Sequence, residues 1–248
     1  MRKTILGIAQ QGVAKPIKTN IKTIEMKKIA VLTGAGISAE SGISTFRDSN
    51  GLWENHDIME VASPQGWQKD PALVLDFYNK RRRQLKSVQP NSAHLYLKEL
   101  EKRYEVCVIT QNVDDLHERA GSSNIIHLHG ELLKVRSEKN ENLVYSCADD
   151  VNIGDKAEDG AQLRPHIVWF GEMVPMLETA AKKVENADVL LIIGTSLVVY
   201  PAAMLVHYLE KGKPVYLIDP DENIEVSGLS NLTVISKSAT EGVKDLPF

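Results

Sequence analysis

A glycine-rich turn near the start of the chain has the spacing of a phosphate-binding loop. Gly34, Ala35, Gly36 and Ser38 belong to the segment GAGISA, which follows the apolar run IAVLT and matches the pattern G-x-G-x-x-A. In this pattern the first glycine allows a tight turn, and the second lets the backbone approach a pyrophosphate at a helix N-terminus. The segment indicates a bound nucleotide, with a tight glycine turn that holds no ligand as the alternative.

The region after this turn argues against a hydride-transferring dehydrogenase. Such an enzyme carries a second strand that ends in an acidic residue about 20 residues further on, which binds the adenine ribose. Here the region reads TFRDSNGLWENHD, which has the pattern of a polar loop and not of a strand. Its Thr45, Phe46, Arg47 and Trp53 belong to a loop long enough to fold over a ligand. We therefore expect a dinucleotide site without hydride transfer.

Polar residues also follow the apolar run EVCVIT. Gln111, Asn112 and Asp114 stand directly after it, and their side chains can hydrogen-bond sugar hydroxyls or an amide. The alternative is helix capping, with Asn112 as the cap of a helix that starts at Val113.

A histidine stands at the end of another apolar run. His129 comes just before Gly130 in the segment IIHLHG, and a neutral imidazole at the rim of a crevice can take a proton from a hydroxyl near neutral pH. A hydrogen-bonded structural histidine is the alternative for His129, and that is how we interpret His127. We expect the two rings to share a face if the strand alternation persists to the end.

The elements that must position these residues alternate along the chain. Short β-branched runs bounded by turn residues predict strands at IAVLTG, EVCVIT, IIHLHG, HIVWFG, DVLLIIG, PVYLID and LTVIS. They are apolar on both faces, which is typical of a parallel sheet covered by helices. Helical patterns lie between several of them, at residues 72–85 and 92–103 and in MLETAAKKVENA and AAMLVHYLEK. The alternation predicts an α/β fold with a doubly wound parallel sheet.

The unusual residues follow the strands of this predicted sheet. Phe170-Gly171-Glu172 comes after HIVW, and Gly194-Thr195-Ser196 comes after DVLLII, in addition to the three segments above. Ligands of open parallel sheets bind at the carboxyl ends of the strands, so we expect one shared crevice. Residues 131–165 are polar and interrupt the alternation, which predicts a small inserted subdomain or a long loop.

The composition argues against several classes of function. The chain of 248 residues carries a net charge of −4, which gives no basic field for nucleic acid. No apolar run approaches the roughly 20 residues of a membrane helix. Of the two cysteines, Cys107 lies in an apolar run and Cys147 in a polar stretch. We expect neither a disulfide framework nor a four-ligand zinc site, and a reducing compartment fits.

Residues 1–25 differ from the rest of the chain. They hold five basic residues and one acidic residue and lack the apolar core of a secretory signal. The segment MKKIAVLTG, from Met26, has the pattern of a natural start. We interpret 1–25 as a loosely ordered extension or an upstream start, with a basic organelle-targeting segment as the alternative. We expect a cytoplasmic protein, or a mitochondrial one if the source is eukaryotic.

Together these segments resemble the sirtuin family, the NAD-dependent protein lysine deacylases. The resemblance runs from about Ile29 to the C-terminus and rests on GAGISAESGI, TFR, TQNVDDLHERAG, HLHGE, RPHIVWFGE, GTSLVVYPAA and the late Ser238-Ala239. No single segment is decisive, but their joint occurrence in this order is very specific. The match is closest to the bacterial and mitochondrial class III branch that removes acidic acyl groups.

The resemblance implies a Rossmann-like large domain within a catalytic domain at 26–248, with a small domain grown from insertions at about 50–90 and 131–165. It implies that NAD is consumed: the acyl oxygen of the substrate lysine attacks the ribose carbon as nicotinamide leaves, and O-acyl-ADP-ribose and free lysine result. His129 falls on the catalytic histidine that deprotonates a ribose hydroxyl, and Asn112 and Asp114 position the ribose and the nicotinamide amide. The residues implied for NAD binding are Gly34, Ala35, Gly36, Ser38, Ser41, Thr45, Phe46, Arg47, Trp53, Gln111, Asn112, Val113, Asp114, Gly194, Thr195, Ser196, Ile218, Asp219, Pro220 and Ala239.

One helix carries a candidate for substrate choice. Tyr78 and Arg81 stand three residues apart, so they share a face of the predicted helix, and an arginine fork with a phenol can bind a carboxylate. In the resembling branch the pattern Tyr-x-x-Arg marks desuccinylases and demalonylases, and a small residue matching Ala62 leaves room for the acyl group. The resemblance also places Phe170 in the substrate site. A solvated basic helix is the alternative, because Arg81 begins a run of three arginines.

The segment VRS at 135–137 departs from the family, because relatives commonly read VRC there and bind a structural zinc with four cysteines. We expect no zinc, so the small domain needs another source of order, with a mobile insert as the alternative. The expected partners are acylated lysines of proteins, with no nucleic acid and no membrane, and a monomer is the working expectation. The alternatives for function are a mono-ADP-ribosyltransferase with the same NAD site and an NAD- or ADP-ribose-binding module without turnover.

Overall fold

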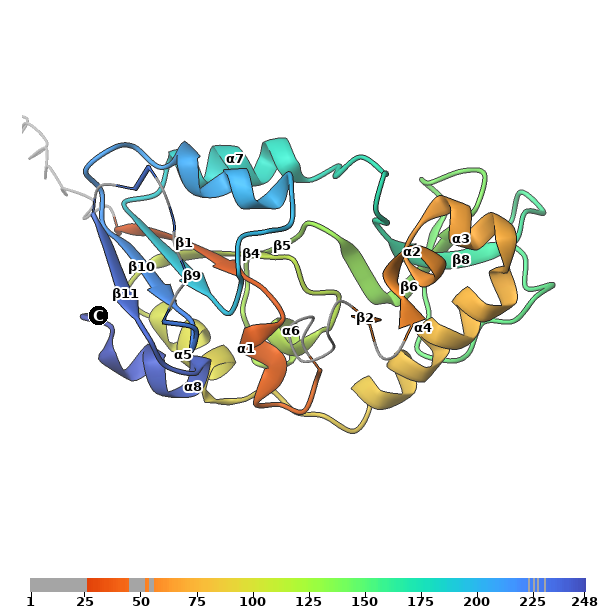
Figure 1. Ribbon diagram of the computed structural model, residues 1–248, viewed down its shortest axis with the longest axis horizontal. Helices are drawn as coiled ribbons and strands as arrows, with labels where there is room; N and C mark the ends of the chain where they lie inside the picture. Colours follow the sequence, from red (N-terminus) through yellow and green to blue (C-terminus); the bar gives the residue numbers. More distant parts are fainter. Residues whose placement is uncertain are drawn as a thin grey trace, which may run out of the picture.

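A six-stranded parallel sheet forms the centre of the molecule, in the order β11-β10-β9-β1-β4-β5 (Figure 1). The computed structural model describes residues 26–44, 52–53, 56–222, 224, 226, 228–229 and 231–248. The strands of the sheet are β1 Lys28–Thr33, β4 Glu105–Thr110, β5 Ile125–His127, β9 Val189–Ile193, β10 Val215–Ile218 and β11 Leu232–Ile235. Every residue of β9 is buried, as expected for a strand covered on both faces.

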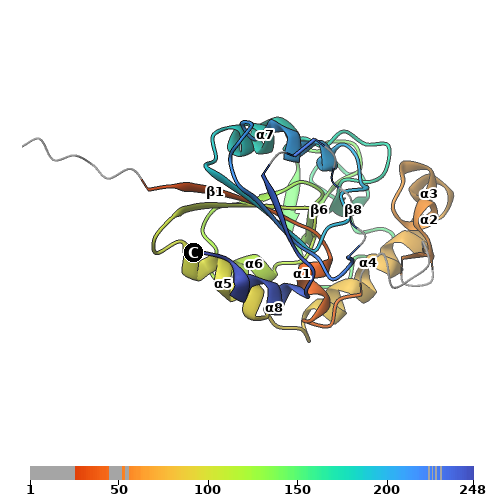
Figure 2. The ribbon, with the colours of Figure 1, turned by 60° about the vertical axis from the view of Figure 1, so that its left-hand side comes forward.

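Helices cover both faces of this sheet. On one face lie α7 (Leu177–Glu185) and the 3-10 helix η2 (Ala202–Tyr208), and on the other lie α5 (Ser92–Leu100) and α8 (Ala239–Gly242) (Figure 2). Successive residues of β1 belong to opposite cores, with Ala30 facing the first pair of helices and Val31 the second. The predicted doubly wound α/β fold is therefore confirmed.

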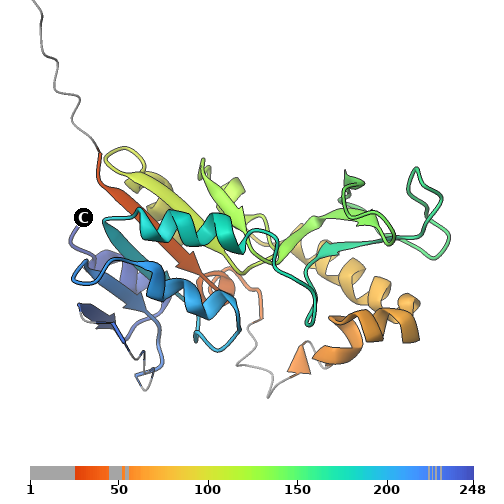
Figure 3. The ribbon, with the colours of Figure 1, turned by 90° about the horizontal axis from the view of Figure 1, so that it is seen from above.

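A smaller module packs beside the carboxyl edge of the sheet (Figure 3). It combines a three-stranded antiparallel sheet, in the order β7-β6-β8, with three helices. Its elements are β6 Gly130–Ser137, β7 Val144–Ser146, β8 Leu163–Ile167, α2 Ile58–Val61, α3 Pro64–Lys69 and α4 Pro71–Leu85, and the short strands β2 Leu52–Trp53 and β3 His56–Asp57 precede α2. One apolar core joins the helices to the antiparallel sheet, so the two predicted insertions pack on each other.

One predicted strand belongs to a different sheet. The segment HIVWFG was expected in the parallel sheet, but β8 ends at Ile167 and pairs antiparallel with β6. The run is apolar because Ile167 and Trp169 are buried in the core of the small module. Burial on both sides gives the same sequence pattern in either sheet.

Two helix predictions also need correction. The segment AAMLVHYLEK forms the 3-10 helix η2 and not an α-helix. Asn112 does not cap a helix at Val113, because α6 spans Leu116–Arg119 and the Asp114 carboxylate accepts the Leu116 amide. The helix α5, in contrast, starts where predicted, with Asn91 as its N-cap in a capping box with His94. None of the described helices is long and apolar enough to cross a membrane.

Candidate functional site

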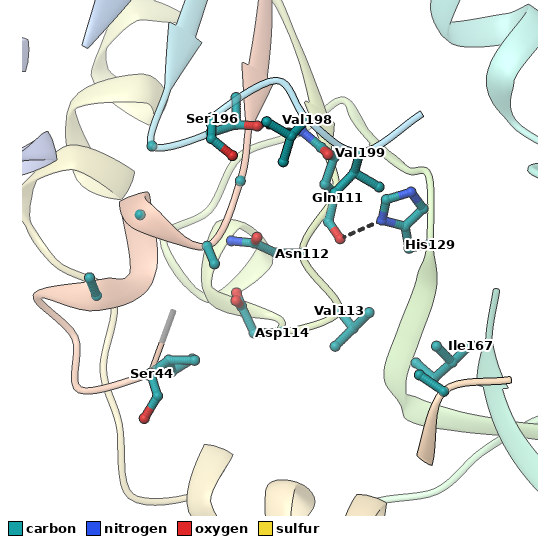
Figure 4. Close-up of a pocket in the computed structure, with 18 of the residues that line it drawn as sticks. Ser44, Gln111, Asn112, Val113, Asp114, His129, Ile167, Ser196, Val198 and Val199 are labelled. Carbon is teal, nitrogen blue, oxygen red and sulfur yellow. Dashed lines mark hydrogen bonds between the residues drawn. The ribbon is translucent and has the colours of Figure 1, made fainter. Parts of the chain in front are cut away.

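A cavity of about 500 Å³ opens at the carboxyl ends of the parallel strands and reaches the small module. Figure 4 shows part of its lining, from the turn after β1 to β8. The predicted site residues that line the cavity are Gly34, Ala35, Gly36, Ala62, Arg81, Gln111, Asn112, Val113, Asp114, His129, Phe170, Gly194, Thr195, Ser196, Ile218, Asp219, Pro220 and Ala239. The strand ends therefore meet at one crevice, as the sequence predicted.

The remaining predicted residues lie elsewhere. Thr45, Phe46 and Arg47 fall outside the described residues, as does the side chain of Trp53. Ser38 is buried beneath the cavity. The hydroxyl of Ser41 accepts a hydrogen bond from the Asn91 amide.

The glycine turn packs directly on the end of β9. The Gly36 amide donates to the Gly194 carbonyl at 2.8 Å, and a Cβ on Gly36 would lie 2.6 Å from the Cα of Gly194. Gly194 itself adopts a φ of +63°, which is unfavourable for residues with a side chain. Glycine is therefore required in part because the two loops pack closely against each other. The same glycine backbone also lines the cavity.

A buried chain of hydrogen bonds fixes the loop after β4. The Asn112 amide donates to the Ser38 hydroxyl at 3.2 Å, and that hydroxyl donates to the Asp114 carboxylate at 3.0 Å. Burial raises the pKa of Asp114 to about 6, against the two hydrogen bonds that favour its charged form. Ser38 therefore orients two polar groups that line the cavity.

His129 lies across from this loop (Figure 4), and its Nδ1 contacts the Gln111 carbonyl at 3.0 Å. A carbonyl can only accept, so in the neutral ring Nδ1 carries the proton and Nε2 keeps its lone pair. Burial lowers the pKa of His129, against the Gln111 hydrogen bond. The ring is therefore neutral near pH 7 and able to act as a base.

His127 has a different environment, as expected. Its Nε2 lies 2.5 Å from the Glu118 carboxylate. Burial lowers the pKa of His127, but the Glu118 carboxylate outweighs burial and raises it. The two histidines do not share a face of one strand, because β5 ends at His127.

The far end of the cavity is formed by the small module. Arg81 lines it with its guanidinium 4.8 Å from the centre of the Phe77 ring. Tyr78 is fully buried outside the lining, and its hydroxyl accepts the Trp169 indole N–H at 3.1 Å. The alternative of a solvated basic helix is wrong for Arg81 and Arg82, which are both buried.

Glu40 is a site residue that the sequence analysis missed. Its carboxylate accepts hydrogen bonds from the Ser238 hydroxyl at 3.0 Å, the Thr240 amide at 2.9 Å and the Thr240 hydroxyl at 2.6 Å. It therefore ties the turn after β1 to the start of α8, beside Ala239. The partners lie 200 residues apart, so local spacing carried no signal for them.

Within the described chain, no group of three or more histidine, cysteine or acidic side chains could hold a metal ion. At the VRS segment the buried Ser137 hydroxyl donates to Asp159 at 2.7 Å and accepts the amides of Lys139 and Asn140. These bonds give the small module a source of order at this point.

Comparison with known proteins identifies the family. A model of the Sir2 family matches residues 34–201. The chain belongs to the Sir2 family. A protein of Helicobacter pylori named NAD-dependent protein deacylase is 61% identical over 222 residues, which cover 89% of this chain and 96% of that protein. This Sir2-family membership confirms the resemblance to the sirtuins.

Solved structures support the same conclusion. A Sir2 homolog in complex with NAD is 42% identical and matches this fold with a TM-score of 0.80, over 89% of this chain and 88% of that one. A Sir2 protein bound to a propionylated peptide is 29% identical, with a TM-score of 0.73 over 89% of this chain and 92% of that one. The Rossmann-like fold of this Sir2-family chain is therefore shared with proteins that bind NAD and an acylated peptide.

Proposed function

We propose that this chain is an NAD-dependent protein lysine deacylase that prefers succinyl and malonyl groups. One observation carries the proposal: a single cavity joins the glycine turn, a neutral His129 and the guanidinium of Arg81. Deacylase relatives and a Sir2 complex with NAD support NAD as the co-substrate. The cytoplasmic location and the monomeric state stay predictions.

The residues of the large domain fit a bound dinucleotide. The glycines at 34, 36 and 194 leave bare backbone in the lining, where a Cβ would clash with the facing loop. Asn112 and Asp114 would position the nicotinamide ribose and the carboxamide, because amide and carboxyl groups hydrogen-bond such groups. NAD would supply a nicotinamide–ribose bond that breaks with loss of nicotinamide as the ribose carbon takes the acyl oxygen, and water would then complete the transfer of the acyl group to the ribose and free the lysine.

His129 holds the proton-transfer role in this proposal. Its Nδ1–H is engaged by the Gln111 carbonyl, so Nε2 is the atom that accepts a proton from a ribose hydroxyl. Burial keeps the ring neutral at physiological pH by lowering its pKa. This proton transfer requires no metal ligand from the chain.

The acidic-acyl preference rests on the small module. Arg81 is buried in the cavity wall, and a buried guanidinium binds a carboxylate more strongly than an exposed one does. Ala62 contributes only a methyl group to the same wall, which leaves space for an acyl chain that ends in a carboxylate. An acetyl group offers Arg81 no charged partner.

The test compares acetyl-, malonyl- and succinyl-lysine peptides with the wild type, Arg81→Met and Arg83→Met. Arg83 is the matched control, since it lies on the same helix but is half exposed and pairs with Asp150. We expect Arg81→Met to lower kcat/KM for succinyl and malonyl peptides by about 10- to 100-fold, the worth of one charge-assisted hydrogen bond to a carboxylate. Deacetylation by Arg81→Met and all activities of Arg83→Met should change little.

An equal loss of deacetylation and desuccinylation in Arg81→Met would contradict the acidic preference. Label from NAD that becomes attached to a protein, without O-acyl-ADP-ribose, would indicate an ADP-ribosyltransferase instead. NAD that binds and stays intact for hours with an acylated peptide present would indicate a binding module.

A further inference from the structure

An ion pair with a buried arginine supports the wall of the cavity at its acyl end. Arg164 of β8 and Glu172 of the following loop form it, and both residues contact Trp169. We propose that Arg164 and Glu172 are positioning residues for acidic-acyl selectivity: the pair holds Trp169 against Tyr78, and Arg164 offsets the negative charge of Glu172 in the cavity wall. This inference rests on the proposed function.

The geometry around Trp169 is fixed from several directions. The Arg164 guanidinium lies 3.3 Å from the centre of the Trp169 ring and makes a two-pronged pair with Glu172, at 2.7 and 3.2 Å. It also donates to the Ile167 carbonyl at 3.0 Å, and the Glu172 carboxylate accepts the Trp169 amide at 2.8 Å. Both the backbone and the ring of Trp169 are therefore held by this one ion pair.

Trp169 connects this ion pair to α4 through a hydrogen bond to Tyr78. Its indole nitrogen can only donate, so the Tyr78 oxygen must act as the acceptor of their 3.1 Å hydrogen bond. Burial raises the pKa of Tyr78, so the phenol keeps its own O–H as a donor at any physiological pH. Tyr78 stands three residues before Arg81 on the same helix. The orientation of Trp169 thus helps to set the face of α4 that carries Arg81.

The same pair also offsets the negative charge of the Glu172 carboxylate in the cavity wall. Glu172 lines the cavity, where an uncompensated carboxylate would repel an acidic acyl group. Burial raises the pKa of Glu172, but the hydrogen bond and charge of Arg164, the Trp169 amide and Arg136 outweigh burial and lower it. Arg136 contacts Glu172 at 3.2 Å and also the exposed Glu141 at 3.4 Å. Arg164 and Arg136 together therefore offset the negative charge of Glu172 in the cavity wall.

Three variants separate these effects. Arg164→Met removes the fork, the ring contact and one positive charge. Arg164→Lys keeps the charge but loses the two-pronged geometry. Trp169→Phe keeps an aromatic ring and removes the donor to Tyr78. Arg83→Met, on the exposed side of α4, serves as the control.

We expect Arg164→Met to lower kcat/KM for succinyl peptides by about tenfold relative to acetyl peptides, the worth of about one charge-assisted interaction. Its KM for NAD should stay unchanged, because the pair lies at the acyl end. Arg164→Lys should fall between Arg164→Met and the wild type. Trp169→Phe should also lose succinyl selectivity. Without NAD, the affinity of Arg164→Met for a fluorescent succinyl-lysine peptide should fall by the same factor.

The outcomes for the two proposals are distinguishable. If the wild type itself shows no preference for acidic acyl groups, the proposed preference fails, whatever the variants do. If the wild type shows the preference and Arg164→Met and Trp169→Phe lower acetyl and succinyl activity equally, the positioning role is overturned. If Arg164→Met does not fold, Trp169→Phe and the peptide-binding measurement on Arg164→Lys decide the question: retained succinyl selectivity in both overturns the inference, and reduced selectivity supports it.

Discussion

Replacement of Asp114 by asparagine should make the protein more stable and less active. The carboxyl is buried, and its pKa rises from 3.8 to about 6 because burial disfavours the charged form. The folded protein therefore holds this proton more tightly than the unfolded chain does. The stability contributed by the bound proton of Asp114 is lost as the pH rises from 3.8 to 6, and this loss is complete above pH 6. Asparagine removes this cost because it carries no charge.

The size of the effect follows from the pKa shift and the hydrogen bonds. A shift of this size costs about 3 kcal/mol at pH 8 and about half of that at pH 5. The carboxylate accepts both the Ser38 hydroxyl and the Leu116 amide, and asparagine has one oxygen for these two donors. The lost hydrogen bond costs about 1 kcal/mol. The net gain is about 2 kcal/mol at pH 8, a rise in Tm of about 4 to 8 °C, and close to zero at pH 5.

The assay is thermal unfolding of the wild type and Asp114→Asn at pH 5 and pH 8. Asp149→Asn is the control, since Asp149 is 91% exposed in its pair with Lys86 and should shift Tm by no more than about 1 °C. Nicotinamide release by Asp114→Asn should fall at the same time, because the carboxylate faces the proposed ribose site. A lower Tm at pH 8, or a shift of the same size at both pH values, would refute the reasoning about burial.

Three further predictions concern other parts of the fold. Gly36→Ala should weaken NAD binding and lower Tm, because the new Cβ would lie 2.6 Å from the Cα of Gly194; unchanged NAD affinity in a calorimetric titration would contradict this. Ser137→Ala should lower the free energy of unfolding by about 1 to 2 kcal/mol and expose the 138–162 segment to protease, whereas a chelator should leave the Tm of the wild type unchanged. Burial lowers the pKa of His94 and His117 to about 4 and about 3, so the contribution of these two histidines to stability should fall as the pH drops from 6.5 toward 4. The slope of Tm against pH in that range should be smaller in His94→Gln, and an equal slope would disagree with the assigned burial.

The parallel sheet could be predicted because its strands are covered on both faces and read as continuous apolar runs. The same property led to the wrong prediction for HIVWFG, because β8 is also buried, but against helices of the small module. The segment at 202–208 has a helical apolar pattern, but periodicity does not distinguish the 3-10 helix η2 from an α-helix.

The site was predictable where its residues follow strands and not where it depends on distant contacts. The strand-end rule brought His129, Asn112 and Asp114 together with the glycine turn. The bond of Glu40 to Thr240 spans 200 residues, and the pair of Trp169 with Tyr78 spans 91. Such contacts depend on how distant segments pack, which no local spacing in the sequence encodes.

The central claim is that His129 in this cavity serves an NAD-consuming deacylation. The most direct test measures nicotinamide release and NAD affinity in the wild type and in His129→Ala, with a succinyl-lysine peptide present. The wild type should release one nicotinamide for each peptide deacylated. His129→Ala should bind NAD with the same Kd and lose about 10²- to 10⁴-fold in turnover, the usual contribution of a general base. Wild-type turnover in His129→Ala, or no nicotinamide release by the wild type from any acylated peptide, would contradict the claim.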